Sequence, residues 1–405
     1  MLVHNARASR TAYPAGLRSI MSLEQAHESH RWLAPWAGIA QAATPLHDMP
    51  DLAARFQVGR FSVKDESARS PLASFKALGA PIALVRQILR VHPGLAPAAI
   101  LSGRYADRLK GYTVVSATDG NHGRGLAAAA RDAGVRCVIV LHANVRMERE
   151  EAIARFGAEI VRIEGNYDES VEEAARLAAE HGWQVISDTS YDGYEDIPRD
   201  VMQGYGIIAA ELVAQTGARA GEDAAHTHVL VQGGVGGLAA GIVSYFWEYH
   251  GARRPRFIVV EPAQADCLLQ SAIHGRPWKA TGSVDSVMAG LACGETSPLA
   301  WKFLASSVDH FMTIEDWQAV EAMRTLSTGS ERDIPIVAGE SGAAGLAAVQ
   351  MLRNDAALSE EVGLGPESSV LIINTEGATA PELYRELVGE SADAVMARRA
   401  ARWGR

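Results

Sequence analysis

Strands and helices alternate through the middle of this chain of 405 residues, and the alternation restricts its fold more than any other feature. Strands are predicted at 111–117, 135–141, 159–163 and 184–186, with helices between them at 123–133, 146–156 and 170–181. The pattern resumes with a helix at 201–216, strands at 228–232 and 256–260, and a helix from Leu238 between those strands. Such alternation is typical of a mostly parallel sheet covered by helices on both faces. The sequence therefore predicts an α/β fold.

The chain is longer than the size at which one hydrophobic core usually stops growing, so two domains are expected. A strand at 60–64 and a helix at 75–91 precede the alternating region, and a β-branched strand at 369–373 follows it. The segment 92–110 has the composition of a connector between domains, and the first 51 residues are predicted to form an irregular, ordered arm. We predict a larger domain formed by 1–90 and 195–405, with a smaller α/β domain, 91–194, inserted into it.

Composition excludes several classes of function. The formal net charge is −10 and the isoelectric point is near 5.7, which argues against a nucleic-acid partner. No apolar stretch approaches the length of a membrane span. The three cysteines, Cys137, Cys267 and Cys293, are too few for a disulfide framework or a zinc knuckle, so we expect no metal and a reducing, cytoplasmic location. Two interpretations of Cys267 and Cys293 stay open: small buried residues, or a redox-sensitive pair.

Lys76 is the first candidate for chemistry. The chain has five lysines, and Lys76, in Ser74-Phe75-Lys76, begins the predicted helix with Ser74 as a plausible cap. Because the helix gives its side chain a fixed base, the ε-amine is suited to form a Schiff base with an aldehyde cofactor. The alternative is a solvated lysine at the start of a helix.

The glycine-rich loop 232–238 lies between a predicted strand and a predicted helix. Its glycines let backbone N–H groups turn toward a phosphate, which the helix N-terminus also favours. Gly234 to Ala239 also satisfies the dinucleotide pattern G-x-G-x-x-G/A, and Glu261 follows Ala239 by 22 residues, where a ribose-binding acid is expected. This loop alone therefore indicates NAD as readily as another phosphate.

Two further loops follow predicted strands, where ligands of α/β sheets bind. The loop 118–123 offers backbone N–H groups for a substrate carboxylate, an amide at Asn121 for a cofactor hydroxyl, and a carboxyl at Asp119 that is able to move a proton. The alternative for Asp119 is an Asx turn. In the loop after the C-terminal strand, Thr375 is able to bond a heteroaromatic nitrogen, or else it is a plain capping residue.

These motifs, taken in order, resemble those of the fold-type II pyridoxal phosphate enzymes, the tryptophan synthase β or threonine dehydratase superfamily. The resemblance rests on the S-F-K lysine, the G-N-H-G loop and the G-G-V-G-G loop. Within that superfamily the segments 118–125, 287–295 and 375–377 are similar to the diaminopropionate ammonia-lyase family. The resemblance extends from about Thr44 to the C-terminus, and the arm before Thr44 matches no segment of the family.

The resemblance implies a two-domain enzyme with mostly parallel, twisted sheets, pyridoxal 5'-phosphate as cofactor and a homodimer as assembly. It implies that Lys76 holds the cofactor, that Asp119 and Asp188 are catalytic acids or bases, and that Asn121 bonds the cofactor ring hydroxyl. The phosphate would be held by Gly233, Gly234, Val235, Gly236 and Gly237, and the ring nitrogen would face Thr375. The substrate would be bound by Thr118, Asp119, Gly120, Asn121 and His122.

The expected reaction is the α,β-elimination of 2,3-diaminopropionate, as the D isomer, the L isomer or both, to pyruvate and two ammonia. An amine leaves poorly unless it is protonated, so an acid near Cβ has a chemical purpose in this reaction. Two alternatives remain. A serine or threonine dehydratase would share the fold and the cofactor, whereas an NAD-binding dehydrogenase or dinucleotide sensor would explain only 234–239.

Substitution of Asp119 tests whether two bases act on opposite faces of the substrate. If Lys76 and Asp119 each remove the Cα proton of one enantiomer, Asp119→Asn will depress turnover of the D isomer more than that of the L isomer. The two rates are measured separately by coupling pyruvate to a dehydrogenase. An equal loss on both isomers would contradict the two-base hypothesis.

Overall fold

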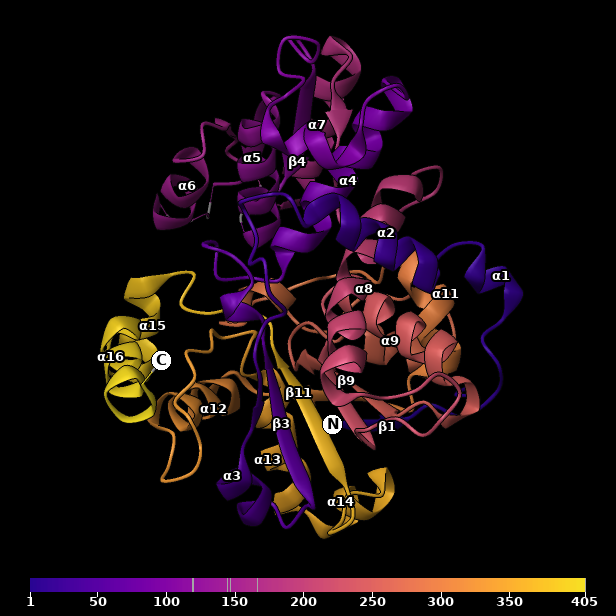
Figure 1. The fold of residues 1–405 in the computed structure, drawn as a ribbon, viewed down its shortest axis with the longest axis vertical. Helices are drawn as coiled ribbons and strands as arrows, with labels where there is room; N and C mark the ends of the chain where they lie inside the picture. The colour runs from indigo at the N-terminus through magenta and orange to yellow at the C-terminus, as the bar shows by residue number, and fades with distance from the viewer. Residues whose placement is uncertain (119, 144, 146, 166, 405) are drawn as a thin grey trace.

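The chain folds around two sheets with helices on their faces. The computed structural model describes residues 1–118, 120–143, 145, 147–165 and 167–404. In Figure 1 the smaller sheet and its helices lie at the top, and the strands of the larger sheet lie below them. The mixed α/β architecture with mostly parallel strands confirms the fold class that the alternation predicts.

The larger sheet has seven strands in the order β1-β10-β9-β8-β11-β3-β2. The five inner strands run parallel to one another, and β1 and β2 pair antiparallel at the two edges. The bounds are Leu2–His4 for β1, Leu46–Asp48 for β2, Arg60–Asp65 for β3, His228–Gln232 for β8, Arg256–Pro262 for β9, His310–Ile314 for β10 and Ser369–Asn374 for β11. Every residue of β8 and β10 is buried, as expected of parallel strands covered on both faces.

The smaller sheet is formed by consecutive parts of the chain. Its order is β6-β5-β4-β7, and all of its pairings are parallel. The strands are β4 at Thr113–Ala117, β5 at Arg136–Leu141, β6 at Glu159–Arg162 and β7 at Gln184–Val185. All four strands lie inside the segment 91–194. We therefore continue to propose that this segment forms the smaller, inserted domain.

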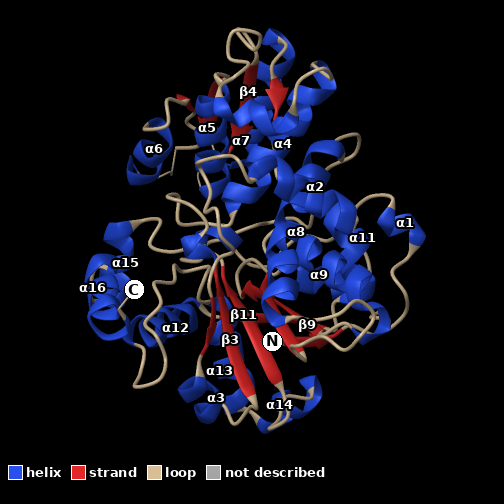
Figure 2. Cartoon of the chain, viewed as in Figure 1, coloured by secondary structure: helices blue, strands red, loops and turns tan. Residues whose placement is uncertain are grey.

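Helices cover both sheets, as the blue ribbons of Figure 2 show. Those of the first 216 residues are α1 (Ala15–Arg18), α2 (Leu23–Leu33), α3 (Pro50–Arg55), α4 (Lys76–Val91), α5 (Asn121–Ala133), α6 (Met147–Ala154), α7 (Tyr167–His181) and α8 (Asp196–Thr216). The later ones are α9 (Gly237–His250), α10 (Cys267–His274), α11 (Pro298–Ser307), α12 (Asp316–Thr328), α13 (Ala344–Asn354), α14 (Ala356–Val362), α15 (Pro381–Val388) and α16 (Ala392–Trp403). None of these described helices is both long enough and apolar enough to cross a bilayer.

The N-terminal arm is more regular than the sequence predicts. Within the first 51 residues the structure has two short strands and the helices α1 and α2, and α3 begins at Pro50, so the arm is ordered as predicted but contains regular elements that the sequence pattern did not indicate. Strand β1 is held at the edge of the sheet by its pairing with β10, and the Asn5 side chain donates to the backbone oxygens of Ala305 and Val308. Pairing to a distant strand is a tertiary contact, and no local pattern in a strand of three residues predicts it.

Helix α4 joins the two halves of the fold. It packs against α5, which covers the smaller sheet, and against α8, which covers the larger one. Ten of its sixteen residues are buried, from Ala77 to Ile88. Because the first residue of α4 is Lys76, this packing fixes the lysine backbone between the two sheets.

A buried ionic cluster fastens α8 to β3, and its loss should be costly. Glu211 of α8 accepts from Lys64 Nζ at 2.7 Å and from Arg69 Nη1 at 2.6 Å, and none of the three side chains is more than 5% exposed. Glu211→Ala would leave two buried cations short of a partner, so we expect the free energy of unfolding to fall by about 3 to 5 kcal/mol. Urea denaturation of the holoenzyme measures this change.

The exposed Glu222 supplies the matched control for that measurement. Glu222→Ala should change the free energy of unfolding by less than about 0.5 kcal/mol. If Glu211→Ala had an equally small effect, the cluster would not hold α8 in place.

Candidate active site

The side chain of Lys76 forms an ion pair with Asp188. The ammonium Nζ lies 2.5 Å from Asp188 Oδ2, and the two side chains are 20% and 23% exposed. The rings of Phe75 and Tyr205 lie beside the ammonium, with their centroids 5.4 and 5.8 Å from Nζ. The structure therefore brings together two residues that the resemblance singles out, 112 positions apart in the chain.

The ion pair controls the protonation of both partners. Burial alone would lower the pKa of Lys76, but the carboxylate of Asp188 outweighs burial and raises that pKa above its ordinary value. Burial alone would raise the pKa of Asp188, but Lys76 and then His122 outweigh it and lower that pKa. Asp188 thus holds the Lys76 amine as an ammonium in the resting site, and the amine has to lose this proton before it can act as a nucleophile.

His122 lies behind Asp188. It is 3% exposed, its Nε2 lies 3.0 Å from the Ile186 carbonyl oxygen, and its Nδ1 lies 3.7 Å from Asp188 Oδ2. Burial lowers the pKa of His122, so the ring is neutral at pH 7. His122, which the resemblance places among the substrate-binding residues, therefore faces the ion pair.

Tyr194 holds the loop that carries Asp188. Its hydroxyl accepts from the Ser187 backbone N–H at 2.9 Å and donates to the Val185 carbonyl oxygen at 3.0 Å. The ring stacks on Tyr191, with the centroids 4.8 Å apart. Because both hydrogen bonds are made to the backbone just before Asp188, they fix the direction from which its carboxylate approaches Lys76.

The glycine loop lies between β8 and α9. Gly234 and Gly236 have φ angles of +65° and +102°, which favour glycine. A Cβ on Gly233 would lie 2.6 Å from Glu261 Cγ, so this position has no room for a side chain. No side chain caps the start of α9 at Gly237, which leaves backbone N–H groups of the first turn for a ligand. The loop has the geometry of a phosphate site.

Glu261 does not have the role that the dinucleotide pattern predicts. It is fully buried and accepts from the backbone N–H groups of Leu268 and Leu269, each at 2.8 Å, so it caps the start of α10. Burial raises the pKa of Glu261 to about 8. A buried carboxyl engaged with a helix cannot reach a ribose hydroxyl. The interpretation of 234–239 with Glu261 as an NAD site is therefore wrong.

Asn121, the first residue of α5, contacts the C-terminal loop of the larger sheet. Its Nδ2 donates to Glu376 Oε2 at 2.5 Å, and its Oδ1 accepts from Arg124 Nη1 at 3.1 Å. Glu376 Oε1 in turn accepts from the Ser341 backbone N–H at 3.2 Å. The Asn121 amide, which is predicted to bond a cofactor hydroxyl, is thus oriented by Glu376 on one side and by Arg124 on the other. The sequence did not predict the contact between Asn121 and Glu376.

Thr375 lies next to the backbone that carries the lysine. Its carbonyl oxygen accepts from the Phe75 backbone N–H at 3.1 Å, and Ser74 pairs with Glu376 in an isolated bridge. The residue is 2% exposed. The end of β11 and the start of α4 are therefore held side by side, as the motif order implies.

One predicted site residue lies outside the described residues, and the other lysines lie away from Asp188. Asp119 lies outside the described residues, and its neighbours Thr118 and Gly120 are half-buried at the end of β4. Among the other lysines, Lys64 is buried in the Glu211 cluster, and Lys110, Lys279 and Lys302 are exposed. Lys76 is thus the lysine whose surroundings suit covalent chemistry.

Two cysteines lie at the glycine loop. Cys267 Sγ lies 3.5 Å from the Gly234 carbonyl oxygen, and a Cβ on Gly234 would lie 3.6 Å from Cys293 Sγ. Both thiols are free, and burial raises the pKa of Cys293 to about 12. Both cysteines therefore lie close to Gly234, and the two interpretations, small residues of the fold or a redox-sensitive pair, both stay open.

Glu340 is a second residue that the sequence analysis did not single out. It is 6% exposed, and burial together with the nearby charge of Glu376 raises its pKa to about 7. In the sequence, Glu340 lies between Gly339 and Gly342. A Cβ added to either glycine would lie within 3 Å of an atom of 374–377, so these glycines allow the two segments to approach closely. Glu340 therefore titrates near neutrality beside the residue that orients Asn121.

The titration of Glu340 predicts how stability depends on pH. In the unfolded chain the carboxyl of Glu340 loses its proton near its ordinary pKa of 4.5, whereas in the folded protein it keeps the proton up to about pH 7. The free energy of unfolding therefore falls as the pH rises from 4.5 to about 7. Between pH 5 and pH 8 this titration should lower the free energy of unfolding by on the order of 2 kcal/mol, and Glu340→Gln should remove that decrease. Urea denaturation at both values measures the difference, and parallel pH profiles for the two proteins would contradict this origin.

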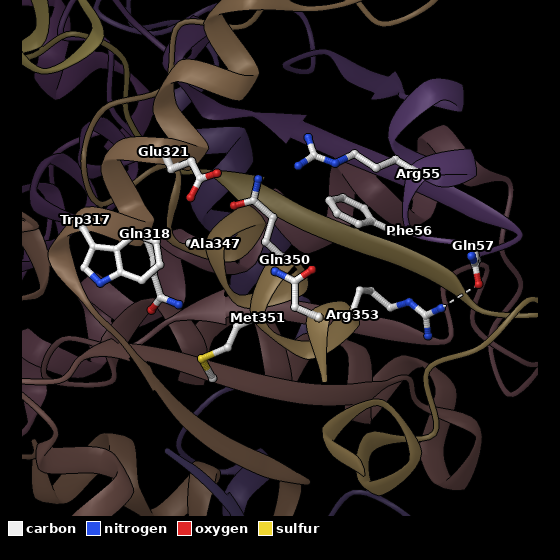
Figure 3. Close-up of a pocket in the computed structure, with 11 residues that line it drawn as sticks. Arg55, Phe56, Gln57, Trp317, Gln318, Glu321, Ala347, Gln350, Met351 and Arg353 are labelled. Atoms are coloured by element: carbon white, nitrogen blue, oxygen red, sulfur yellow. Dashed lines mark hydrogen bonds between the residues drawn. The ribbon is translucent and has the colours of Figure 1, made fainter. Parts of the chain in front are cut away.

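A separate hollow lies on α12, α13 and the end of α3. It has a volume of about 330 Å³, and Figure 3 shows Trp317, Gln350 and Arg353 among its lining side chains. None of the residues that line it is a lysine, a histidine or a cysteine. Because these lining residues offer no nucleophile, the hollow is not the site of the lysine chemistry.

Comparisons with known proteins agree with this arrangement. The model of a family described as pyridoxal-phosphate dependent enzyme matches residues 39–396. Diaminopropionate ammonia-lyase of Escherichia coli strain K12 is 38% identical over 358 residues, which cover 87% of this chain and 88% of that protein. A crystal structure of the selenomethionine-containing holo form of the E. coli enzyme covers 96% of both chains with a TM-score of 0.85 and 34% identity. Another, in complex with D-serine, covers 98% of both chains with a TM-score of 0.84 and 35% identity.

Proposed function

Because this chain belongs to the pyridoxal-phosphate dependent enzymes and, within them, to the diaminopropionate ammonia-lyase family, we propose that it eliminates ammonia from 2,3-diaminopropionate. The products are pyruvate and two ammonia. The observation that carries the proposal is the Lys76–Asp188 ion pair, which lies on a scaffold shared with that family over 96% of the chain.

The residues present fit the cofactor. A lysine amine beside a proton acceptor suits an aldehyde, and the positive φ angles of Gly234 and Gly236 suit a phosphate. The Tyr205 hydroxyl is buried near Lys76 and has no hydrogen-bond partner among the described residues. An unpaired buried hydroxyl is costly, so a polar ligand in this space would compensate it.

The proposal assigns each cofactor contact to residues of this chain. Lys76 would hold the cofactor, 233–237 its phosphate, Asn121 its ring hydroxyl and Thr375 its ring nitrogen. When bound, the cofactor supplies an electron sink for an amino acid whose Cα loses a proton. Every other step is left to the side chains of this chain.

Lys76 would remove the Cα proton from its own face of the substrate. Asp188, 2.5 Å from Nζ, stabilises the ammonium that this transfer creates. Asp119 would act from the other face, and the proton that Lys76 or Asp119 removes from Cα would be passed to the β-amino group as it leaves. The contact of Glu376 with Asn121 keeps the amide in one orientation throughout.

Turnover of several amino acids by the purified holoenzyme tests the proposal. Pyruvate is coupled to a dehydrogenase, and the absorbance spectrum is recorded with D- and L-2,3-diaminopropionate, D- and L-serine and L-threonine. We expect a visible cofactor band that shifts with 2,3-diaminopropionate, and the highest rate of pyruvate formation with one or both of its isomers.

Two results would change the assignment. A band with serine or threonine preferred would keep the fold and make the chain a dehydratase, a possibility raised by the D-serine complex of the E. coli enzyme. Absence of a band after reconstitution with pyridoxal 5'-phosphate would contradict the role of Lys76.

We further propose a cytoplasmic homodimer that acts on a small amino acid and takes no part in nucleic-acid or membrane binding. The net charge of −10 supports the absence of a nucleic-acid partner. Sedimentation of the holoenzyme measures the assembly, and a monomer at working concentrations would contradict the dimer.

A further inference from the structure

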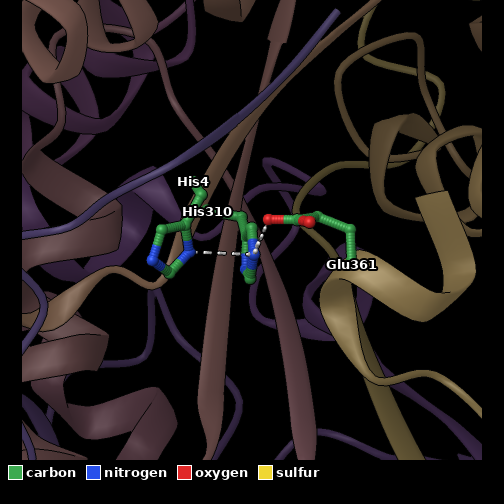
Figure 4. Close-up of side chains that lie close together, drawn as sticks. All are labelled: His4, His310 and Glu361. Atoms are coloured by element: carbon green, nitrogen blue, oxygen red, sulfur yellow. Dashed lines mark hydrogen bonds and ion pairs between the residues drawn. The ribbon is translucent and has the colours of Figure 1, made fainter. Parts of the chain in front are cut away.

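Three side chains that the proposed reaction does not use converge at the edge of the larger sheet. His4 lies on β1, His310 lies opposite it on β10, and Glu361 lies in α14. Figure 4 shows the three side chains directed toward one another. One nitrogen or oxygen from each lies within 4.8 Å of the other two. Two imidazoles and one carboxylate form a ligand set that transition metals prefer.

The spacing fits a metal better than it fits hydrogen bonds. His4 Nδ1 lies 3.4 Å from His310 Nε2, and His310 Nε2 lies 3.8 Å from Glu361 Oε1. Both separations exceed the usual range of hydrogen bonds between nitrogen and its acceptors, about 2.7 to 3.2 Å. Two nitrogens bound tetrahedrally to Zn²⁺ at 2.0 to 2.1 Å lie about 3.3 Å apart. The histidine pair already has this separation, and the exposed Glu361 needs only a small side-chain rotation to join it.

The surroundings also favour a bound ion. His310 is 3% exposed, and its Nε2 is the ring nitrogen that faces both His4 and Glu361. Beside the cluster lies a cavity of about 520 Å³, which leaves room for water in the fourth position of a tetrahedral site. Three carboxylates line the cavity, and Asp309 is already paired with Arg10 and Arg254, which leaves Asp223 and Glu361 for a cation.

We propose that His4, His310 and Glu361 bind a zinc ion that fastens the N-terminal strand to the sheet. The ligands come from an edge strand, its neighbour and a helix that lie far apart in the chain, so the ion would cross-link three elements. This gives a role to the arm before Thr44, whose function the sequence motifs do not indicate. The lining residues of the cavity include none from the Lys76 site, so the ion stabilises the fold and leaves the chemistry unchanged.

Metal titration of the untagged, chelator-treated holoenzyme tests this proposal. We expect one Zn²⁺ per chain in isothermal titration calorimetry, with a micromolar dissociation constant. Saturation should raise the Tm by about 2 to 4 °C. Co²⁺ should give the intense visible bands of a tetrahedral site. Turnover should stay within about twofold of the metal-free rate.

Variants of the two exposed ligands make the test specific. His4→Gln and Glu361→Gln should each weaken binding at least about 10-fold and abolish the Co²⁺ bands. His30→Gln, at an exposed histidine of α2, serves as the matched control and should bind as the parent does. The proposal would be overturned by the absence of stoichiometric binding to the parent, or by His4→Gln binding as tightly as the parent.

Discussion

Replacement of Lys76 by alanine is expected to lower pyruvate formation from 2,3-diaminopropionate at least about 1,000-fold. The amine has two proposed tasks, to hold the cofactor and to move the Cα proton, and alanine removes both. The visible band should also be lost, because Lys64 is held in the Glu211 cluster and Lys110, Lys279 and Lys302 are exposed. Pyruvate coupling gives the rate, and the absorbance spectrum gives the state of the cofactor.

Lys302→Ala is the matched control. Lys302 is exposed and pairs with Glu195 at 2.8 Å on the surface, so its loss should leave turnover within about twofold. A Lys76→Ala protein that is folded and keeps both its band and its turnover would exclude Lys76 from the reaction.

The alternation of strands and helices predicted the inner part of the fold well. The strand expected at 228–232 is β8, and the strand expected at 369–373 is β11 with one residue added. Both are continuous apolar runs because parallel strands here are covered on two faces. A strand that is buried on both faces has a run of apolar residues, and this run can be recognised in the sequence without knowing which strands it pairs with.

The segment between 261 and 368 shows where such signals fail. The structure has β10 and the helices α10 to α14 there, none of which the sequence analysis predicted. Helix α13 contains Gly345 and has no side-chain cap, so packing in the core and not local propensity stabilises it. Helix α12 is different, because Glu315 and Gln318 form a capping box, in which Glu stands where Ser, Thr, Asp or Asn is usual, so the local signal is present in an atypical form.

The candidate site divides in the same way. Lys76, Asn121 and the glycine loop were identifiable because each follows a strand and precedes a helix, and the carboxyl ends of parallel strands meet. The contact between Asn121 and Glu376 joins residues 255 positions apart and two different sheets, and the raised pKa of Glu340 depends on that same neighbourhood. Such contacts depend on the position of one sheet relative to the other, and a local sequence pattern does not predict that position.

Asp188→Asn should separate two effects of the ion pair. Because the carboxylate raises the pKa of Lys76, its neutralisation lowers that pKa and increases the neutral fraction of the amine near pH 7. The apoenzyme should therefore form its cofactor band faster than the parent at pH 7. Turnover of the isomer whose Cα proton Lys76 removes should nevertheless fall about 100-fold, since the asparagine amide cannot stabilise the ammonium that this transfer creates. Stopped-flow absorbance and pyruvate coupling measure the two rates.

The opposite signs of these two effects distinguish a chemical role from a structural one. If Asp188 only shaped the loop, Asp188→Asn would slow cofactor binding and turnover together. Asp192→Asn, four residues later and exposed, should change neither rate. Faster band formation combined with slower turnover would mean that Asp188 restrains the resting lysine and serves the reaction once substrate is bound. Equal rates for Asp188→Asn and the parent in both assays would leave the ion pair without a part in catalysis.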